Sequence, residues 1–322
     1  MSHEVEIIDG QAQMAYAGEL PWHGLGTKVA SDLAPSQIMQ QAGLDWSVEK
    51  ETMTTASGVE IEGKKALVRS SDSKVLDVVG DNWNPVQNSE AFEFFSEYCL
   101  AGDMEMHTAG SLKGGQMVWA LAKIKESFDI LGGDQVDSYL LFSNPHKYGK
   151  AIDVRFTPIR VVCNNTLSLS LGQNVANSVS LNHRTAFNPE SVKQTMGIAH
   201  EKFAKYKETC EFLASKKFNM ESLIQYYNEV FPRTYQGKNE VTVKGYEDLT
   251  NNAQKAFSFL ETQPGANFGE GSWWSALNSV TYLTDHKMGR ESDSRLTSAW
   301  FGANQTRKVK AVEKAVEFAL AS

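Results

Sequence analysis

The chain has 322 residues, of which 41% are hydrophobic and 10% aromatic, and its formal net charge is −8. This composition is typical of a packed protein and excludes an intrinsically disordered one. No run of residues approaches the roughly 20 apolar positions that a membrane-spanning helix needs, and the first residues lack the apolar centre of a signal peptide. We therefore expect a cytoplasmic protein with no membrane partner.

The three cysteines, Cys99, Cys163 and Cys210, are separated by wide gaps. An odd number of widely spaced cysteines indicates reduced thiols rather than a disulfide framework. No two of them have the CxxC spacing of a structural zinc site, and the seven histidines form no HExxH motif. The sequence therefore predicts neither a metal site nor a cofactor.

The acidic and basic residues are distributed unevenly along the chain. Residues 1–110 contain 6 Lys and Arg against 18 Asp and Glu, whereas residues 111–217 contain 14 against 9. The last third, residues 218–322, is nearly balanced, with 11 against 12. This asymmetry is compatible with one basic surface on an otherwise acidic protein.

The first elements in chain order are a loop and a short helix. Residues 20–26 contain the pair Trp22-His23 between a proline and two glycines, which predicts an irregular loop. Trp22 is expected to anchor this segment on the core, although a loop that contacts a ligand would have the same composition. A helix is expected over residues 32–42, because Ser31-Asp32 can cap its start and a glycine follows its last residue.

Three strands and a second helix are expected next. Trp46 and Val48 alternate with polar residues, and residues 65–69 and 74–79 are expected to pair across a Ser-Asp-Ser turn. The second helix begins at Asn88-Ser89 and extends to about Leu100. An antiparallel meander covered by helices is typical of α+β domains.

Two further hairpins are expected in the middle of the chain. Residues 104–124 form the first, with a glycine-rich turn at 110–115. Residues 139–142 and 150–157 form the arms of the second, whose turn is basic and whose polar face carries Arg155. The sequence thus predicts an antiparallel sheet domain with backing helices over residues 1–187.

Residues 188–322 are expected to form a helical lobe that docks on the sheet domain. Apolar residues between 192 and 213 recur at alternating spacings of four and three, as in a seam that packs on one partner helix. That partner helix can belong to the same chain or to a second subunit, so a homo-oligomer formed through this helix is one hypothesis. A short strand over residues 241–243 is weakly indicated, and helices are expected over residues 219–230, 246–261, 272–285 and 306–321.

A cluster of basic and aromatic residues is the most suggestive functional feature. Basic side chains on a strand surface can follow a phosphate backbone, and aromatic side chains between them can stack on unpaired bases. The alternative interpretation is a solvated hairpin followed by a helix with surface ion pairs. The candidate nucleic-acid-binding residues are Lys147, Tyr148, Lys150, Arg155, Arg160, His183 and Arg184.

Two other functions remain open. Cys163 and His183, with Asn165 orienting the imidazole, could form the nucleophile and base of a cysteine-dependent enzyme. However, the valines before Cys163 indicate a buried and unreactive thiol, so an enzyme is the less favoured interpretation and no catalytic residue is assigned. Alternatively, the acidic first third of the chain could bind a basic host protein, as in a counter-defence factor.

Several longer segments resemble a known family. The segments LPWHGLGTKV, VVGDNWNPVQNSEAFEFF, FTPIRVVCNNTLSLSL, SLNHRT and WWSALNSVTYLTDHKMGRESDSRLTSAWFG are similar to those of phage/plasmid-like proteins that contain domain of unknown function 932. The resemblance implies a protein of a mobile genetic element. The expected order of elements is also weakly similar to that of phage single-strand annealing recombinases, which implies single-stranded DNA in a basic groove. Single-stranded DNA binding or strand annealing is therefore the leading hypothesis.

Overall fold

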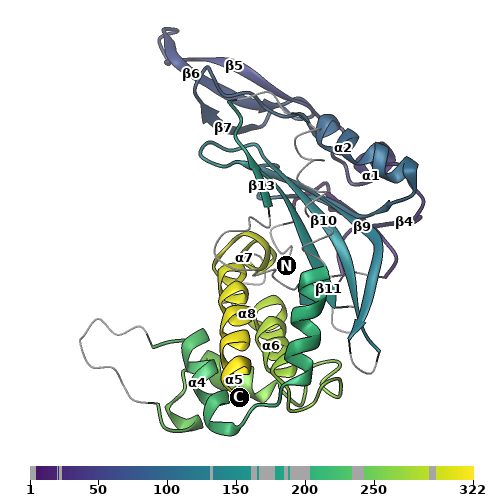
Figure 1. Ribbon diagram of the computed structural model, residues 1–322. Coiled ribbons are helices and arrows are strands. Elements are labelled where there is room, and N and C mark those ends of the chain that lie inside the picture. Colours follow the sequence, from purple (N-terminus) through teal and green to yellow (C-terminus); the bar gives the residue numbers. More distant parts are fainter. Residues whose placement is uncertain are drawn as a thin grey trace. The chain divides into compact units, whose positions relative to one another are not determined.

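A computed structural model describes residues 5–19, 21, 24–130, 133–160, 165–166, 178–184, 188, 204–233, 243–289 and 295–322 (Figure 1). The fold is α+β, with antiparallel sheets and C-terminal helices, as the sequence predicts. The chain divides into two compact units. Unit 1 comprises Met1–Lys125, Tyr139–Phe156 and Ser178–Gly197, and unit 2 comprises Glu126–Ser138, Thr157–Asn177 and Ile198–Ser322. A boundary at residue 187 lies outside the described residues and stays a prediction.

The strands and helices have the following bounds. The strands are β1 (Ile7–Ile8), β2 (Gln11–Ala12), β3 (Met14–Ala17), β4 (Thr27–Val29), β5 (Val48–Thr54), β6 (Glu60–Arg69), β7 (Val75–Val79), β8 (Met104–Leu112), β9 (Met117–Ile130), β10 (Asp134–Pro145), β11 (Ile152–Arg160), β12 (Asn165–Thr166) and β13 (Ser178–Leu181). The helices are α1 (Pro35–Gln41), α2 (Asn88–Ala101), α4 (Met220–Val230), η1 (Tyr246–Asp248), α5 (Asn251–Ser258), α6 (Trp273–Tyr282), η2 (Leu283–Lys287), α7 (Arg295–Phe301) and α8 (Ala303–Ala321), and residues 204–215 are also helical.

The largest sheet has the strand order β12-β11-β10-β9-β8-β3-β4, and β13 also pairs with β11. Strand β3 pairs with β4 in parallel, whereas the pairs β3–β8, β8–β9, β11–β12 and β11–β13 are antiparallel. The predicted hairpin over residues 104–124 is confirmed, because Met104 pairs with Ile124 and Leu112 with Met117. Strands β1 to β4 have no counterpart among the sequence predictions, since runs of two to four residues are too short to show an alternating pattern.

Helices α1 and α2 cover β3 and β8 within unit 1 (Figure 1). Helix α2 occupies nearly the predicted range and ends at Gly102, whose φ of 79° is the left-handed conformation that favours glycine. Its aromatic side chains face β10, and the ring centroid of Phe95 lies 6.1 Å from that of Phe142. Both residues are fully buried, so this aromatic layer is the core of unit 1.

A second sheet, with the order β5-β6-β7, also belongs to unit 1. The predicted pairing of residues 65–69 with 74–79 is confirmed, because Lys65 pairs with Val79 and Val68 with Val75. Leu67 and Val79 are completely buried, whereas residues 49–52 of β5 are exposed. The hairpin of β5 and β6 is therefore buried at one end only.

Unit 2 contains the predicted C-terminal helices, with two differences at their ends. The helix predicted over 246–261 is interrupted, because Thr250 caps a new helix by accepting a hydrogen bond from the Ala253 amide. The helix predicted over 272–285 ends at Tyr282 and continues as the π-helix η2. Helix α6 is buried from Trp273 to Thr281, and Trp273 stacks on Phe318 of α8 with ring centroids 5.5 Å apart. These aromatic contacts form the core of unit 2.

The predicted seam over residues 192–213 is described only from residue 204 onward. In that part Tyr206, Cys210 and Leu213 are buried, and the Tyr206 ring lies 6.4 Å from that of Phe128, also in unit 2. The described end of the seam therefore packs within the chain. An oligomer formed through the remainder stays a prediction.

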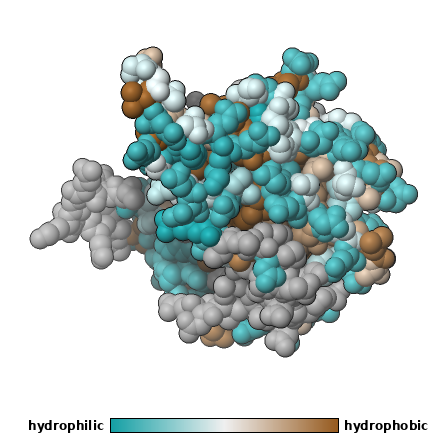
Figure 2. All heavy atoms as spheres, turned by 90° about the horizontal axis from the view of Figure 1, so that it is seen from above, coloured by the Kyte–Doolittle hydropathy of each residue, from teal (hydrophilic) through white to brown (hydrophobic). Residues whose placement is uncertain are grey.

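No described helix combines the length and apolar character needed to cross a membrane. In the view of Figure 2 hydrophilic residues cover most of the described surface, and the hydrophobic residues are scattered among them. The predicted loop pair Trp22-His23 and the predicted strand residues 241–242 lie outside the described residues.

Candidate functional site

Three of the seven candidate residues lie together on an exposed turn. Lys147, Tyr148 and Lys150 occupy the turn between β10 and β11, and all three are exposed. The Tyr148 side chain is 60% exposed, although burial normally stabilises a large aromatic ring. An exposed aromatic residue between two lysines is the arrangement that the sequence predicts for a contact with unpaired bases.

Backbone and side-chain hydrogen bonds fix this turn against its neighbours. The His146 amide donates to the Gln116 carbonyl at 2.9 Å, and the Tyr148 amide donates to the Asp77 carboxylate at 2.7 Å. Gln116 in turn donates from its side-chain amide to the Leu76 carbonyl of β7 at 2.7 Å. The turn is thus attached both to β7 and to the turn that connects β8 with β9.

Two lysines that the sequence analysis did not select lie on the same surface. Lys147 donates from Nζ to Gln116 Oε1 at 3.3 Å, next to the turn that contains Lys113 and Gly114. The Lys74 ammonium lies against Gly114, because a Cβ atom added to this glycine would clash with Lys74 Nζ. Both added lysines are exposed. We call this group the lysine turn cluster; it comprises Lys74, Lys113, Lys147, Tyr148 and Lys150.

The basic candidates farther along the chain are not part of the lysine turn cluster. Arg155 donates from Nε to Asp153 Oδ1 at 2.5 Å, and both side chains are largely buried, so the carboxylate offsets the positive charge. Arg184 is exposed, and its backbone amide donates a hydrogen bond to the Asn182 side chain. The backbone of Arg160 ends β11, but its side chain lies outside the described residues.

The prediction that His183 contacts nucleic acid is not supported, because its ring is buried. The ring stacks on Trp83 with centroids 4.2 Å apart and an interplanar angle of 22°. Its Nδ1 lies 3.2 Å from the Asn84 carbonyl, and the His183 carbonyl accepts from the Asn84 amide at 2.7 Å. Burial lowers the pKa of His183, although the carbonyls of Asn84 and Pro145 partly offset this effect. His183 therefore stabilises the segment before α2.

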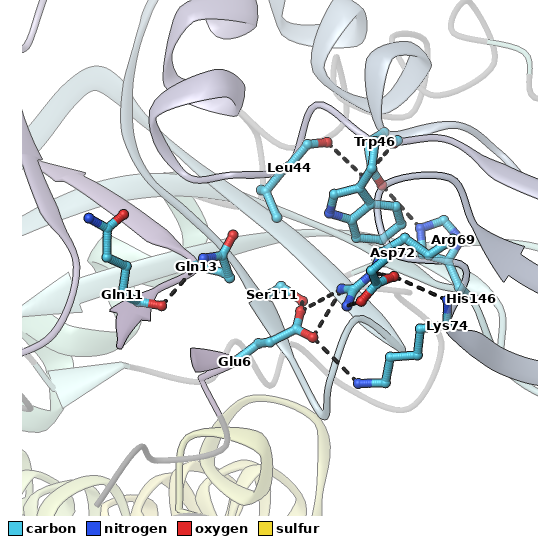
Figure 3. A network of polar contacts seen from close by, with 11 residues as sticks. Glu6, Gln11, Gln13, Leu44, Trp46, Arg69, Asp72, Lys74, Ser111 and His146 are labelled. Atoms are coloured by element: carbon cyan, nitrogen blue, oxygen red, sulfur yellow. Dashed lines mark hydrogen bonds and ion pairs between the residues drawn. The ribbon is translucent and has the colours of Figure 1, made fainter. Parts of the chain in front are cut away.

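A buried ion-pair network includes Lys74 of the lysine turn cluster (Figure 3). Arg69 is 1% exposed and donates to both oxygens of Glu6, at 3.0 and 2.9 Å, and to both oxygens of Asp72, at 2.9 and 2.6 Å. Glu6 also accepts from Ser111 Oγ at 2.9 Å and pairs with Lys74 Nζ at 3.5 Å. The Arg69 guanidinium lowers the pKa of the Asp72 carboxyl to about 2. One buried cation thus binds two carboxylates.

Gly115, in the β8–β9 turn, leaves room for the Arg69 side chain. Its φ is 92°, and a Cβ atom built there would lie 2.8 Å from Arg69 Nη1 and 3.1 Å from Leu76 Cδ2. We expect Gly115→Ala to lower the free energy of unfolding by about 1–3 kcal/mol, since alanine suits neither this backbone conformation nor the contact. Urea unfolding would measure the loss. Gly133→Ala is the matched control for backbone strain, because Gly133 also has positive φ but has no atom within 4 Å.

The network is linked to a buried histidine through a tryptophan. Trp46 lies between Arg69, whose guanidinium carbon is 5.3 Å from the ring centroid, and His146, whose ring centroid is also 5.3 Å away. His146 Nε2 lies 3.0 Å from Asn88 Oδ1, while Asn88 Nδ2 donates to the carbonyls of Leu44 and Trp46. Since Asn88 Oδ1 can only accept, Nε2 of His146 carries the proton. Burial lowers the pKa of His146 to about 3, so the ring is neutral.

No group of three or more potential metal ligands occurs among the His, Cys, Asp and Glu residues that the structure describes. Cys163 lies outside the described residues, so the Cys163–His183 dyad stays an untested hypothesis. Lys74 and Lys113 could have been suspected from their positions in turns, but nothing in the local sequence shows that these turns meet the turn at 146–151.

Comparisons with known proteins identify a family without assigning a reaction. Residues 75–312 match the family described as Domain of unknown function (DUF932). This segment includes β7, Gln116 and the turn at 146–151, but Glu6, Arg69 and Lys74 precede it. No curated protein and no solved structure matches the chain. Because the match covers more than half of the sequence, the chain belongs to the DUF932 family.

Proposed function

We propose that the protein binds single-stranded nucleic acid, most readily single-stranded DNA, through the lysine turn cluster. The observation that carries this proposal is the exposed Tyr148 ring between Lys147 and Lys150, on a turn that is hydrogen bonded on two sides. Aromatic–base stacking is tolerant of sequence because every base offers a π-face, and lysines add the attraction to phosphate.

Three carboxylates near this surface each form a hydrogen bond or an ion pair, and they lie beside four exposed lysines. Asp72 is bound by Arg69, and Asp77 accepts from the amides of Val78 and Tyr148. Glu6 is buried and pairs with both Arg69 and Lys74. The four exposed lysines of the cluster, together with Arg69, outnumber these three carboxylates in a protein whose overall charge is −8. This local excess of positive charge supports a contact with phosphates despite the acidity of the whole chain.

The biological setting of this proposal comes from the resemblance to phage and plasmid proteins. In that setting the protein would act as an accessory factor that holds or anneals single strands of a mobile element. It would use binding alone, without a reaction. Burial of His183 supports a binding function, because a buried imidazole is not placed to act as a base on a ligand.

Reversing two charges of the turn tests the proposal. We expect Lys147→Glu/Lys150→Glu to weaken binding to a fluorescent single-stranded oligonucleotide by roughly 10- to 100-fold at low salt. The slope of log affinity against log salt should fall by about two, one for each lysine that contacts a phosphate. Anisotropy titrations with single-stranded DNA, double-stranded DNA and RNA would measure both quantities and rank the ligands.

A matched control keeps the result specific to this surface. Lys205→Glu/Lys207→Glu makes the same change of charge on exposed residues of unit 2 and should leave the affinity unchanged. Tyr148→Ala removes the stacking ring without changing charge and should cost roughly 5- to 100-fold. Equal binding by the wild type and the Lys147→Glu/Lys150→Glu variant, or no binding by the wild type, would overturn the assignment.

A further inference from the structure

The two edges of the sheet β5-β6-β7 differ in how they are covered. At β7 the Leu76 carbonyl accepts from the Gln116 side chain, and the Val78 amide donates to the side chain of Asp77. Side chains therefore satisfy two outward polar groups of this edge, as natural proteins commonly arrange to prevent unwanted strand pairing. The β7 edge is closed to a further strand.

The edge formed by β5 is closed only at its first residue. The side chain of Gln87 accepts from the Val48 amide at 2.9 Å and donates to the Val48 carbonyl at 3.0 Å. Both backbone groups of Val48 thus point away from β6. Because strand residues alternate and the register with β6 is regular as far as Thr52, the amides and carbonyls of Lys50 and Thr52 also point outward.

No described residue bonds to these outward groups of Lys50 and Thr52, and residues 49–52 are all exposed. The Lys50 side chain turns away toward the Asp81 carbonyl, to which it donates at 2.9 Å. Edges of this kind accept an extended peptide as an additional strand, in which main-chain hydrogen bonds supply affinity and alternate side chains supply specificity.

The charges along β5 indicate which peptide would fit. Glu49 and Glu51 lie on the same face of the strand, two residues apart, and neither forms an ion pair with a described cation. On the opposite face Lys65 contacts both Thr52 and Glu60, and Lys50 donates to the Asp81 carbonyl. A strand with Lys or Arg at alternate positions would place a cation beside each of the two glutamates.

A second copy of the chain fits this edge poorly. If two β5 strands paired in antiparallel orientation through Lys50 and Thr52, the central registers would place Glu49 opposite Glu51, or a glutamate opposite itself. Like charges directly opposite each other destabilise a strand pair. The glutamates therefore act against self-association and in favour of a basic partner.

From these observations we propose that the β5 edge is a docking site for an extended basic segment of another protein, which adds to the sheet as a fourth strand beside β5. This function is separate from nucleic-acid binding, because the lysine turn cluster lies next to the β7 edge of the same sheet and carries the opposite charge. One domain would thus hold an anionic ligand beside one edge and a basic peptide at the other.

A short peptide that alternates lysine with threonine is the probe, titrated into the full chain by fluorescence anisotropy. We expect saturable binding that slows the amide exchange of Lys50 and Thr52. Glu49→Lys/Glu51→Lys should weaken it about tenfold or more, because two favourable cross-strand pairs become repulsive. Glu261→Lys/Glu270→Lys makes the same change of charge on exposed residues of unit 2 and should have no effect.

Thr52→Pro tests the strand geometry directly. Proline removes an outward amide and is tolerated on edge strands, so binding should be lost while the fold persists. If this variant unfolds, the Glu49→Lys/Glu51→Lys pair, which leaves the backbone unchanged, decides the question. The proposal is overturned if the wild type does not bind the peptide, if the β5 and unit 2 charge variants bind equally, or if a folded Thr52→Pro variant binds as the wild type does.

Discussion

Replacing Arg69 by methionine is expected to lower the free energy of unfolding by about 3–5 kcal/mol, because it leaves buried Glu6 without its main partner. Arg69 and Glu6 have side chains that are 1% and 6% exposed, so water cannot replace the lost ion pair. Of the residues that the structure describes, Ser111 and the more distant Lys74 remain bonded to the Glu6 carboxylate. Urea unfolding at neutral pH would measure the loss through the transition midpoint at constant slope.

Two further variants separate the buried pair from the exposed one. Glu6→Gln/Arg69→Met removes both buried charges and should be more stable than Arg69→Met alone, since no unpaired charge then remains. Asp72→Asn removes a carboxylate that is 42% exposed and should cost no more than about 1 kcal/mol. A double variant as unstable as the sum of its single variants would show that Glu6 and Arg69 contribute independently, contrary to this account.

The same network connects stability to the proposed interface. Arg69 holds Glu6 and Asp72, Glu6 contacts Lys74, and Gly115 in the β8–β9 turn approaches the guanidinium. The lysine turn cluster is therefore built on a rigid base, which reduces the ordering that binding would require. We expect Arg69→Met to weaken oligonucleotide binding even where the protein remains folded, but less than Lys147→Glu/Lys150→Glu does.

The parts of the fold that local signals determine were predictable from the sequence. Helix α2 follows from the Asn88-Ser89 start and the glycine at its end, and the β8–β9 hairpin follows from its glycine-rich turn. The short strand β3 was missed, because its pairing depends partly on residues far away in the chain: it pairs with β8, nearly a hundred residues later. Such pairings leave no periodic pattern in a segment of two to four residues.

The residues of the candidate site were also predictable only in part. Lys147, Tyr148 and Lys150 are adjacent in sequence, so their proximity was predictable. Lys74 and Lys113 join them because Gln116 and Asp77 link the turn at 146–151 to the β8–β9 turn and to β7, and no local pattern encodes that meeting.

The burial of polar side chains was not predictable from the sequence. His183 lies in a polar sequence that indicates a surface loop, but its ring stacks on Trp83, a hundred residues earlier. The Arg69–Glu6 pair joins residues 63 positions apart, so its role could not be inferred from either neighbourhood. Burial of polar side chains depends on such distant partners, which single-sequence patterns do not show.

Acidification should destabilise the protein through His146. The pKa of this fully buried histidine is lowered to about 3 in the folded state, from an ordinary value of 6.5. Between these two values the unfolded chain binds a proton that the folded chain does not, so stability falls as the pH falls. The stabilisation is complete above pH 6.5, and about 2 kcal/mol of it should be lost at pH 5 and about 3 kcal/mol at pH 4. His183, whose pKa is also lowered, should add a loss in the same direction.

Comparison with His146→Gln isolates this effect from the titration of carboxylates. The variant retains an amide donor for Asn88 but has no group that titrates near neutral pH. Its unfolding free energy, measured by urea titration at several pH values, should decline less steeply than that of the wild type between pH 6.5 and 4. Nitrogen chemical shifts should also show a neutral His146 ring with its proton on Nε2 at pH 5. A charged ring at that pH, or parallel stability curves for the two proteins, would contradict the buried neutral histidine on which this prediction rests.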